Sequence, residues 1–198
     1  NHMNIINKIL QGFLGNKNEK DVKELRKFVE LANSFGPSLE ALTIDELRNK
    51  TLDFKTKLKE ATVDFTTQID ELKKQVEATE DFTEKEALYA KIDLINKDAY
   101  QVEEKILTEI LPEAFTVLRE TGKRFTNNSQ LEVTASDYDK QLAQMGVDYV
   151  TLKDENTAIW YNEWDAAGRK VKWDMAHYDV QYIGGSALHL GKIAEMQT

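Results

Sequence analysis

The sequence has 198 residues, with 26 Lys and Arg against 35 Asp and Glu, three histidines and no cysteine. The absence of cysteine excludes disulfide frameworks, thiolate zinc sites and cysteine nucleophiles, and the net charge of −9 speaks against nonspecific nucleic-acid binding as the main function. Hydrophobic residues make up 41%, which is enough for a core but leaves too little uninterrupted apolar sequence for a membrane span.

The charge is distributed unevenly along the chain. Residues 1–60 carry a net charge of +2, residues 61–108 carry −6 and residues 109–198 carry −5. The basic excess is concentrated at the start, where residues 1–27 contain six Lys and Arg against three acidic residues. A basic, amphipathic start followed by an acidic body suits contact with a membrane surface better than binding to a polyanion.

The first predicted element is an amphipathic helix over residues 4–14, after a short Asn-His-Met stretch that we interpret as a tag remnant and start. Its apolar side chains share one helical stripe: Ile5, Ile6, Ile9, Leu10, Phe13 and Leu14. This helix either lies on a bilayer or a partner protein, or packs on its own domain as an ordinary terminal helix. No signal peptide is visible in the sequence, so we expect a cytoplasmic protein.

The next segments predict helices. Residues 21–35 form one amphipathic pattern, and Thr43 to Glu46 then reads as a capping box. Two runs with apolar residues three or four apart follow, over residues 47–76 and 88–106, with a second capping box predicted at Thr83 to Glu86. They predict an antiparallel helical hairpin, which either extends beyond the body of the protein or lies flat on it.

Pro112 is predicted to open a further helix over residues 113–125, because proline fits the first turn of a helix. Beyond Phe125 the pattern changes to short strands at 131–134, 147–152, 157–163 and 169–173, with a short helix at 136–145 capped by Ser136 or Asp137. The three tryptophans, Trp160, Trp164 and Trp173, lie in this region. They either form a stacking platform for a ligand or cover one face of a small sheet. The predicted fold class is mainly helical α+β, with a long antiparallel helical hairpin and a small antiparallel β-sheet.

Several ordered blocks carry a family pattern. Residues 178–185 read aromatic-x-Val-Gln-x-x-Gly-Gly, and residues 193–198 read Ile-Ala-Glu-Met-Gln-Thr. Two more blocks are Leu-Pro-Glu-Ala-Phe-Thr-Val-Leu-Arg-Glu at 111–120 and Leu-Thr-Ile-Asp-Glu-Leu-Arg at 42–48. With the basic amphipathic start, this ordered set resembles the SecA family, the ATPase motors of bacterial preprotein secretion. The resemblance covers about half of the chain.

The resemblance implies a domain organisation in which two segments have no counterpart in the common family pattern and are interpreted as insertions. The expected segments are 1–3, the tag remnant and start; 4–60, the N-terminal helices of the motor; 61–107, a helical-hairpin insertion; 108–126, a helix of the motor body; 127–173, a small β-rich insertion; and 174–198, an adenine-recognition segment and the first strand of a truncated P-loop nucleotide-binding domain.

The resemblance also implies an adenine site. Gln181 matches the glutamine with which such motors read adenine, because a side-chain amide offers both a donor and an acceptor to N6 and N7 of the base. Met175 and Tyr178 are candidates for packing beside the base. The implied cofactor is ATP with Mg²⁺, but the family's Gly-Glu-Gly-Lys-Thr run would follow Thr198. We therefore expect no catalytic residue and no metal ligand in these 198 residues, and no ATP hydrolysis by the fragment alone.

The partners implied by the resemblance are a SecYEG-type membrane channel, anionic phospholipids bound by the N-terminal helix, and unfolded preproteins, with a homodimer also compatible and no nucleic acid. The implied location is the cytoplasm and the cytoplasmic face of the inner membrane. The sequence leaves two alternatives. A non-enzymatic helical coiled-coil interaction module explains the hairpin but not the final pattern, and a helicase-like ATPase acting on nucleic acid fits poorly with the acidic charge.

Overall fold

The structure is a computed structural model that describes residues 19–174, and these residues confirm a mainly helical α+β fold with a small antiparallel sheet. They fall into two compact units. We call residues 50–111 the hairpin unit, and the described residues 19–49 and 112–174 the sheet unit. The predicted helix at 4–14, the remainder of the adenine-recognition segment after Asp174 and the predicted nucleotide-binding strand lie outside the described residues. No helix within residues 19–174 combines the length and the apolar character that crossing a membrane requires.

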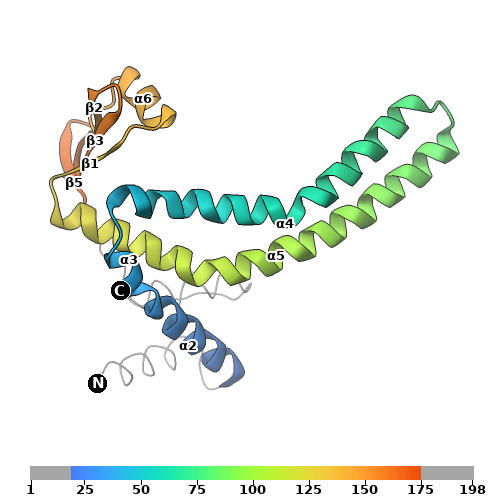
Figure 1. The fold of residues 1–198 in the computed structure, drawn as a ribbon, viewed down its shortest axis with the longest axis horizontal. Helices are drawn as coiled ribbons and strands as arrows, with labels where there is room; N and C mark the ends of the chain where they lie inside the picture. The colour runs from blue at the N-terminus through green and yellow to red at the C-terminus, as the bar shows by residue number, and fades with distance from the viewer. Residues whose placement is uncertain (1–18, 175–198) are drawn as a thin grey trace. The chain divides into compact units, whose positions relative to one another are not determined.

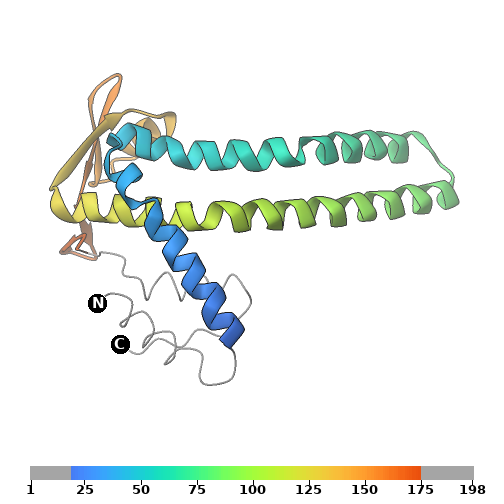
Figure 2. The ribbon, with the colours of Figure 1, turned by 60° about the horizontal axis from the view of Figure 1, so that its bottom comes forward.

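The hairpin unit contains most of two long helices, α4 (Ile44–Ala78) and the first part of α5 (Phe82–Asn127). In this unit they run antiparallel and side by side, joined by a short turn (Figures 1 and 2). Val76 of α4 is buried against Leu88 and Ile92 of α5, and Ile69 and Leu72 pack on this cluster. These residues belong to the seam that the spacing of apolar positions predicted, so the antiparallel hairpin is confirmed.

The N-terminal caps of the two long helices differ in how well the sequence predicted them. At α4, the backbone N–H of Glu46 donates to Thr43 Oγ1 at 3.2 Å and the N–H of Thr43 donates to Glu46 Oε2 at 2.7 Å, which is the predicted capping box. At α5 the prediction of a capping box starting at Thr83 is wrong. Asp81 is the capping residue there, because its Oδ1 accepts from the N–H groups of Thr83 and Glu84 at 2.8 and 3.2 Å.

Pro112 does not open a helix, contrary to the sequence prediction, but lies inside the continuous helix α5. A proline inside a helix removes one i→i−4 hydrogen bond, here the bond that would reach the carbonyl of Thr108. The neighbouring residues compensate, since Ile110 and Val117 on either side are buried and Thr116 donates to the carbonyl of Pro112 at 3.0 Å. Tertiary packing therefore outweighs the local preference of proline for a helix start.

In the sheet unit, α2 (Glu19–Ser34) packs on the part of α5 that follows Pro112. Phe28 and Phe115 meet edge to face at 5.6 Å, and the buried Thr116 hydroxyl donates to the carbonyl of Ala32 at 2.7 Å. The short helix α3 (Gly36–Glu40) follows, and Arg124 of α5 donates through Nη2 to the carbonyls of Leu39 and Leu42 at 3.1 and 2.7 Å. Arg124 thereby satisfies carbonyl groups at the end of α3, as cations commonly do at helix C-termini.

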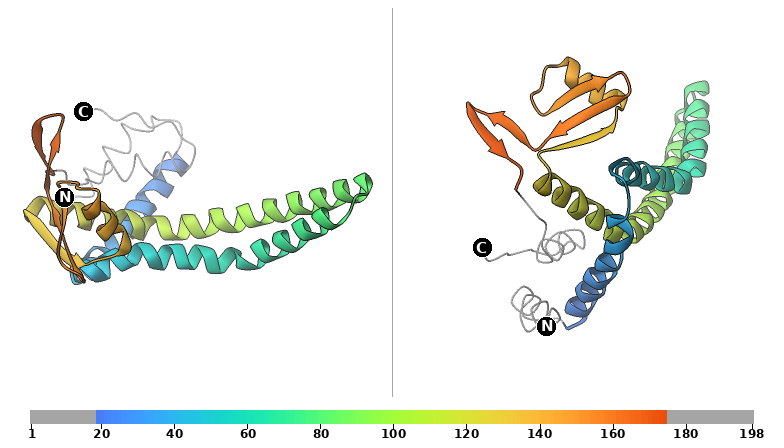
Figure 3. Two further views of the ribbon diagram at one scale, coloured as in Figure 1. Left: turned by 90° about the horizontal axis from the view of Figure 1, so that it is seen from above. Right: turned by 60° about the vertical axis from the view of Figure 1, so that its left-hand side comes forward.

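The strands form two antiparallel sheets, and Figure 3 shows them with α6 beside the first. In the three-stranded sheet, β1 (Gln130–Thr134) and β2 (Val150–Asp154) flank β3 (Thr157–Tyr161). Helix α6 (Asp137–Gln144) starts at the predicted cap Ser136, which forms a full capping box with Asp139. In the two-stranded sheet, β4 (Glu163–Ala166) and β5 (Arg169–Lys172) are joined by Ala167 and Gly168, whose positive φ values of 52° and 80° are typical of a tight hairpin turn.

The predicted single strand over 157–163 is wrong, because the chain changes sheets at Asn162. Asn162 is only 2% exposed, and its side-chain amide donates to the carbonyl of Phe125 at 3.0 Å. Its own backbone N–H donates to the carbonyl of Ser129 at 3.0 Å, one step beyond the Gln130–Tyr161 pair of β1 and β3. This buried asparagine is therefore held by its side chain at the end of α5 and by its backbone at Ser129 and Trp173.

Candidate functional site

The three residues that the sequence singled out for adenine, Gln181, Met175 and Tyr178, lie outside the described residues, so the structure does not test them. What the structure describes is the scaffold that leads to them, up to Asp174. This scaffold offers three features with functional interest: an anchored tryptophan just before the adenine-recognition segment, a buried carboxylate, and an aromatic cavity.

Trp173 is fixed by contacts from two directions. Its backbone N–H donates to the carbonyl of Asn162 at 2.6 Å, and its indole Nε1 donates to the carbonyl of Gly122 in α5 at 3.2 Å. Its ring also packs on Phe125 with the ring centroids 6.4 Å apart. Because Trp173 stands two residues before Met175, α5 and the strands set the point at which the chain enters the predicted adenine segment.

The carboxylate of Asp139 is completely buried and binds donors from three elements. Arg48 of α4 donates to both of its oxygens at 2.9 Å, and Trp160 Nε1 of β3 donates to Oδ1 at 3.1 Å. The N–H of Ser136 donates to Oδ2 at 2.9 Å. A bidentate guanidinium on a buried carboxylate is one of the strong polar contacts in proteins, and here it ties the first turns of α4 to the sheet.

These contacts decide the protonation of Asp139. Burial by itself would raise the pKa of the carboxyl, but the hydrogen bonds from Arg48 and Ser136 and the charge of Arg48 outweigh it, so the pKa lies below the ordinary value of 3.8. Asp139 is therefore ionised at neutral pH. With all its donors supplied by the protein, it is a structural carboxylate and not an acid or base.

The tryptophans meet at a cavity of about 350 Å³ between α5 and the strands. Its walls are apolar and mostly aromatic, formed by Leu118, Thr121, Gly122, Phe125, Tyr149, Trp160, Tyr161, Trp164 and Trp173. All three tryptophans line this cavity, and the stacking platform for a ligand stays a prediction. Among residues 19–174, no carboxyl, amine or imidazole lines the cavity, so its described walls suit an apolar group.

Metal chemistry finds no support in the described part of the chain. Between residues 19 and 174, no three His, Asp or Glu side chains gather in a way that could hold an ion. Some of the carboxylates there are engaged in caps and ion pairs, such as Glu120 with Arg124 at 2.9 Å.

Sequence reasoning missed the residues that organise this scaffold. Arg48 and Asp139 are 91 positions apart, and Arg124 reaches Leu42 over 82 positions. A lone arginine and a lone aspartate carry no periodic signal, so their pairing could not be predicted from one sequence. Asn162 gave one weak signal, because a polar residue interrupts an otherwise aromatic strand; its Oδ1 is buried without a hydrogen-bond partner among the described residues.

The described scaffold ends where the predicted adenine-recognition segment begins. The model of the SecA DEAD-like domain matches residues 10–198. The chain is 48% identical over 196 residues to protein translocase subunit SecA of Christiangramia forsetii, and equally identical over the same length to that of Flavobacterium psychrophilum. It is 40% identical over 192 residues to the SecA subunit of Phocaeicola vulgatus.

The chain therefore belongs to the SecA family. The alignments cover 97–99% of this chain but only 17% of each of the three relatives, so the chain spans about a sixth of their length. Both predicted insertions, 61–107 and 127–173, lie inside the stretch that the family model matches. No solved structure matches the chain.

Proposed function

We propose that this chain is the N-terminal part of an ATP-driven motor that pushes unfolded preproteins through a SecYEG-type bacterial secretion channel. Membership of the SecA family over nearly the whole chain is the observation that carries this proposal, since the relatives are named protein translocase subunits. Because the chain corresponds to 17% of those relatives, the activity belongs to the longer protein. The 198 residues alone do not hydrolyse ATP.

Within this function, Gln181 reads adenine, with Met175 and Tyr178 packing beside the base. The amide of Gln181 donates to N7-type acceptors and accepts from the N6 amine, a combination that guanine does not offer. The structure supports this assignment indirectly, because Trp173 is anchored to α5 and Asn162 just before the segment begins. A fixed entry point lowers the entropy cost of ordering the recognition residues.

The cofactor of the full-length protein is ATP with Mg²⁺, which neutralises charge on the phosphates when bound. We assign no metal ligand and no catalytic residue to this chain. Its own contribution to nucleotide binding is the base contact at Gln181 and the rigid connection that precedes it.

The test is base selectivity in the full-length parent protein. Gln181→Ala should reduce the preference for ATP over GTP by about tenfold or more, since one bidentate base contact contributes about 1–3 kcal/mol of discrimination. The matched control is Gln144→Ala, an exposed glutamine of α6, which should leave both affinities unchanged. Equal ATP-to-GTP ratios in the wild type and the Gln181 variant would remove the adenine assignment.

The proposed membrane contact concerns the helix predicted over residues 4–14, within the basic start of the chain at residues 1–27. We propose that this helix binds anionic phospholipids on the cytoplasmic face of the inner membrane, next to the channel. We also propose that the protein can act as a homodimer. Binding to vesicles with anionic lipid should weaken as salt is raised. Equally strong binding to neutral vesicles would show that charge plays no part.

A further inference from the structure

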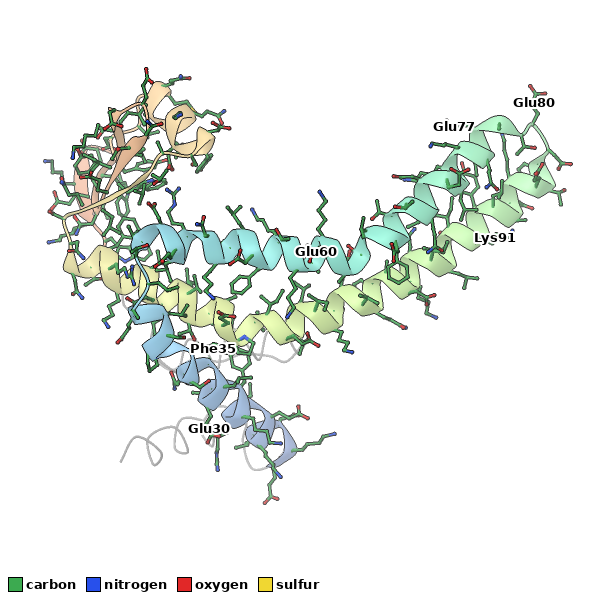
Figure 4. All side chains as sticks on the ribbon, in the orientation of Figure 1. Glu30, Phe35, Glu60, Glu77, Glu80 and Lys91 are labelled. Carbon is green, nitrogen blue, oxygen red and sulfur yellow. The ribbon has the colours of Figure 1, made fainter. Side chains whose placement is uncertain are left out.

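The turn end of the hairpin unit is strongly acidic. Residues 77–104, here called the acidic tip, contain nine acidic residues and three lysines, a net charge of −6. Figure 4 shows Glu77 and Glu80 at the turn between the two helices, with Lys91 further along α5. Within the described residues, none of these nine carboxylates forms an ion pair, although Asp81 and Glu84 accept hydrogen bonds at the start of α5. The charge of the tip is thus left for solvent or a partner.

The acidic tip also exposes aromatic side chains in a regular pattern. Phe82, Tyr89 and Tyr100 of α5 are 73%, 54% and 61% exposed. They are spaced by seven and then eleven residues, and eighteen residues make five turns of an α-helix, so the three rings lie along one line. That line lies about 70° around the helix from Ile92 and about 110° from Leu88 of the buried seam, and all three side chains are more than half exposed.

Charge of one sign decides which partners such a surface accepts. An anionic lipid surface, a nucleic acid and the acidic tip of a second copy are all negatively charged, and each would be repelled by a net charge of −6. The remaining class is a cationic polypeptide. Aromatic rings offer it apolar contact area and a favourable face for guanidinium groups, while the surrounding carboxylates attract it over a longer distance.

We propose that the acidic tip of the hairpin unit binds a basic polypeptide segment that carries apolar side chains between its arginines or lysines. The rings of Tyr89 and Tyr100 contact the apolar groups. Glu86, three residues before Tyr89, and Asp93, between the two tyrosines, attract the cations. This inference does not rest on the proposed function, because it concerns residues of the hairpin unit and needs neither nucleotide nor channel.

The binding test uses the 198-residue chain and a fluorescently labelled synthetic peptide in which arginine alternates with leucine and phenylalanine. We expect saturable binding by fluorescence anisotropy that weakens as salt is raised, since the charged part of the contact is solvent-exposed. Two comparison peptides separate the contributions: one replaces each arginine with glutamate, the other replaces each apolar residue with serine. Both should bind at least about tenfold more weakly, because each lacks one of the two required chemistries.

Variants locate the binding surface. The double variant Tyr89→Ser and Tyr100→Ser should weaken binding about tenfold, because exposed aromatic anchors dominate contacts of this kind. Its control is Tyr138→Ser, since Tyr138 lies in α6 of the sheet unit and is 61% exposed, like Tyr100. Glu86→Gln with Asp93→Asn should weaken binding about threefold and reduce the salt dependence, while Glu155→Gln with Glu163→Gln in the sheet unit should change neither.

Three outcomes would overturn the proposal. The first is equal binding of the arginine and glutamate peptides, which would show that charge does not select the partner. The second is an equal loss on Tyr138→Ser, which would place the contact outside the tip. The third is concentration-dependent self-association in sedimentation experiments that is abolished by the Tyr89 and Tyr100 substitutions, which would make a second copy the occupant. Circular dichroism of each variant is the control for whether the helices remain folded.

Discussion

The hairpin unit and the sheet unit differ in the contacts that stabilise each of them internally. In the hairpin unit, a seam of apolar residues joins two neighbouring helices, with Val76, Leu88 and Ile92 at its buried centre. In the sheet unit, polar side chains connect elements that are distant in sequence: Thr116 to the carbonyl of Ala32, Arg124 to that of Leu42, and Arg48 to Asp139. The hairpin unit relies on a repeating apolar pattern, and the sheet unit adds individual polar contacts to its own buried apolar residues.

This difference in contacts predicts how strongly a single substitution lowers the stability of each unit. A seam tolerates a single apolar substitution because its neighbours in the repeat remain, whereas a buried carboxylate that loses its arginine keeps its charge and loses its compensation. We therefore expect the largest effects of single substitutions in the sheet unit, and smaller, local effects in the hairpin unit.

The strongest test of this comparison is Arg48→Leu. The substitution leaves the fully buried Asp139 without its bidentate partner and should lower the free energy of unfolding of the sheet unit by about 3–5 kcal/mol. Urea unfolding followed by tryptophan fluorescence measures this unit alone, because all three tryptophans lie between residues 160 and 173. The control is Arg169→Leu, an exposed arginine of β5, for which we expect a change below about 0.5 kcal/mol. Equal midpoints for the two variants would contradict the assigned role of Asp139.

A second substitution tests the hairpin unit. Ile92→Ala, at a position only 6% exposed in the seam, should lower local stability by about 2 kcal/mol, the low end for such a truncation because the buried cluster is small. Hydrogen exchange should show faster exchange in the hairpin unit, while the tryptophan unfolding curve stays unchanged. Leu94→Ala, at a 64% exposed position two residues further on, serves as the control and should change exchange little. A shift of the tryptophan curve by Ile92→Ala would show that the two units unfold together.

The same contrast explains what the sequence could predict. The hairpin followed from apolar residues three or four apart, and the Thr43 and Ser136 caps from local spacing. The misassigned features depended on contacts that the residue pattern does not show, local ones at Asp81 and Pro112 and a distant one at Asn162. Pro112 stays inside α5 because Thr116 and the buried neighbours hold it there, and Asn162 divides a predicted strand because the end of α5 supplies its partners. The adenine residues came only from the family resemblance, and they stay a prediction.

The smallest expected effect concerns pH, and it separates charge from packing at Asp139. The pKa of this carboxyl is lowered in the folded state, so its ionised form stabilises the fold above the unfolded pKa near 3.8, and this stabilisation is lost as the pH falls through the lower folded value. The exposed carboxyls of Glu40 and Asp154 also have lowered pKa values and contribute to the same acid slope. Asp139→Asn removes one titrating group while keeping the shape, so tryptophan-monitored stability should be lower than wild type at neutral pH and fall less steeply below about pH 4. Parallel pH profiles for the two proteins would mean that Arg48 binds Asp139 without stabilising its charge, and the sheet unit would then depend on packing as the hairpin unit does.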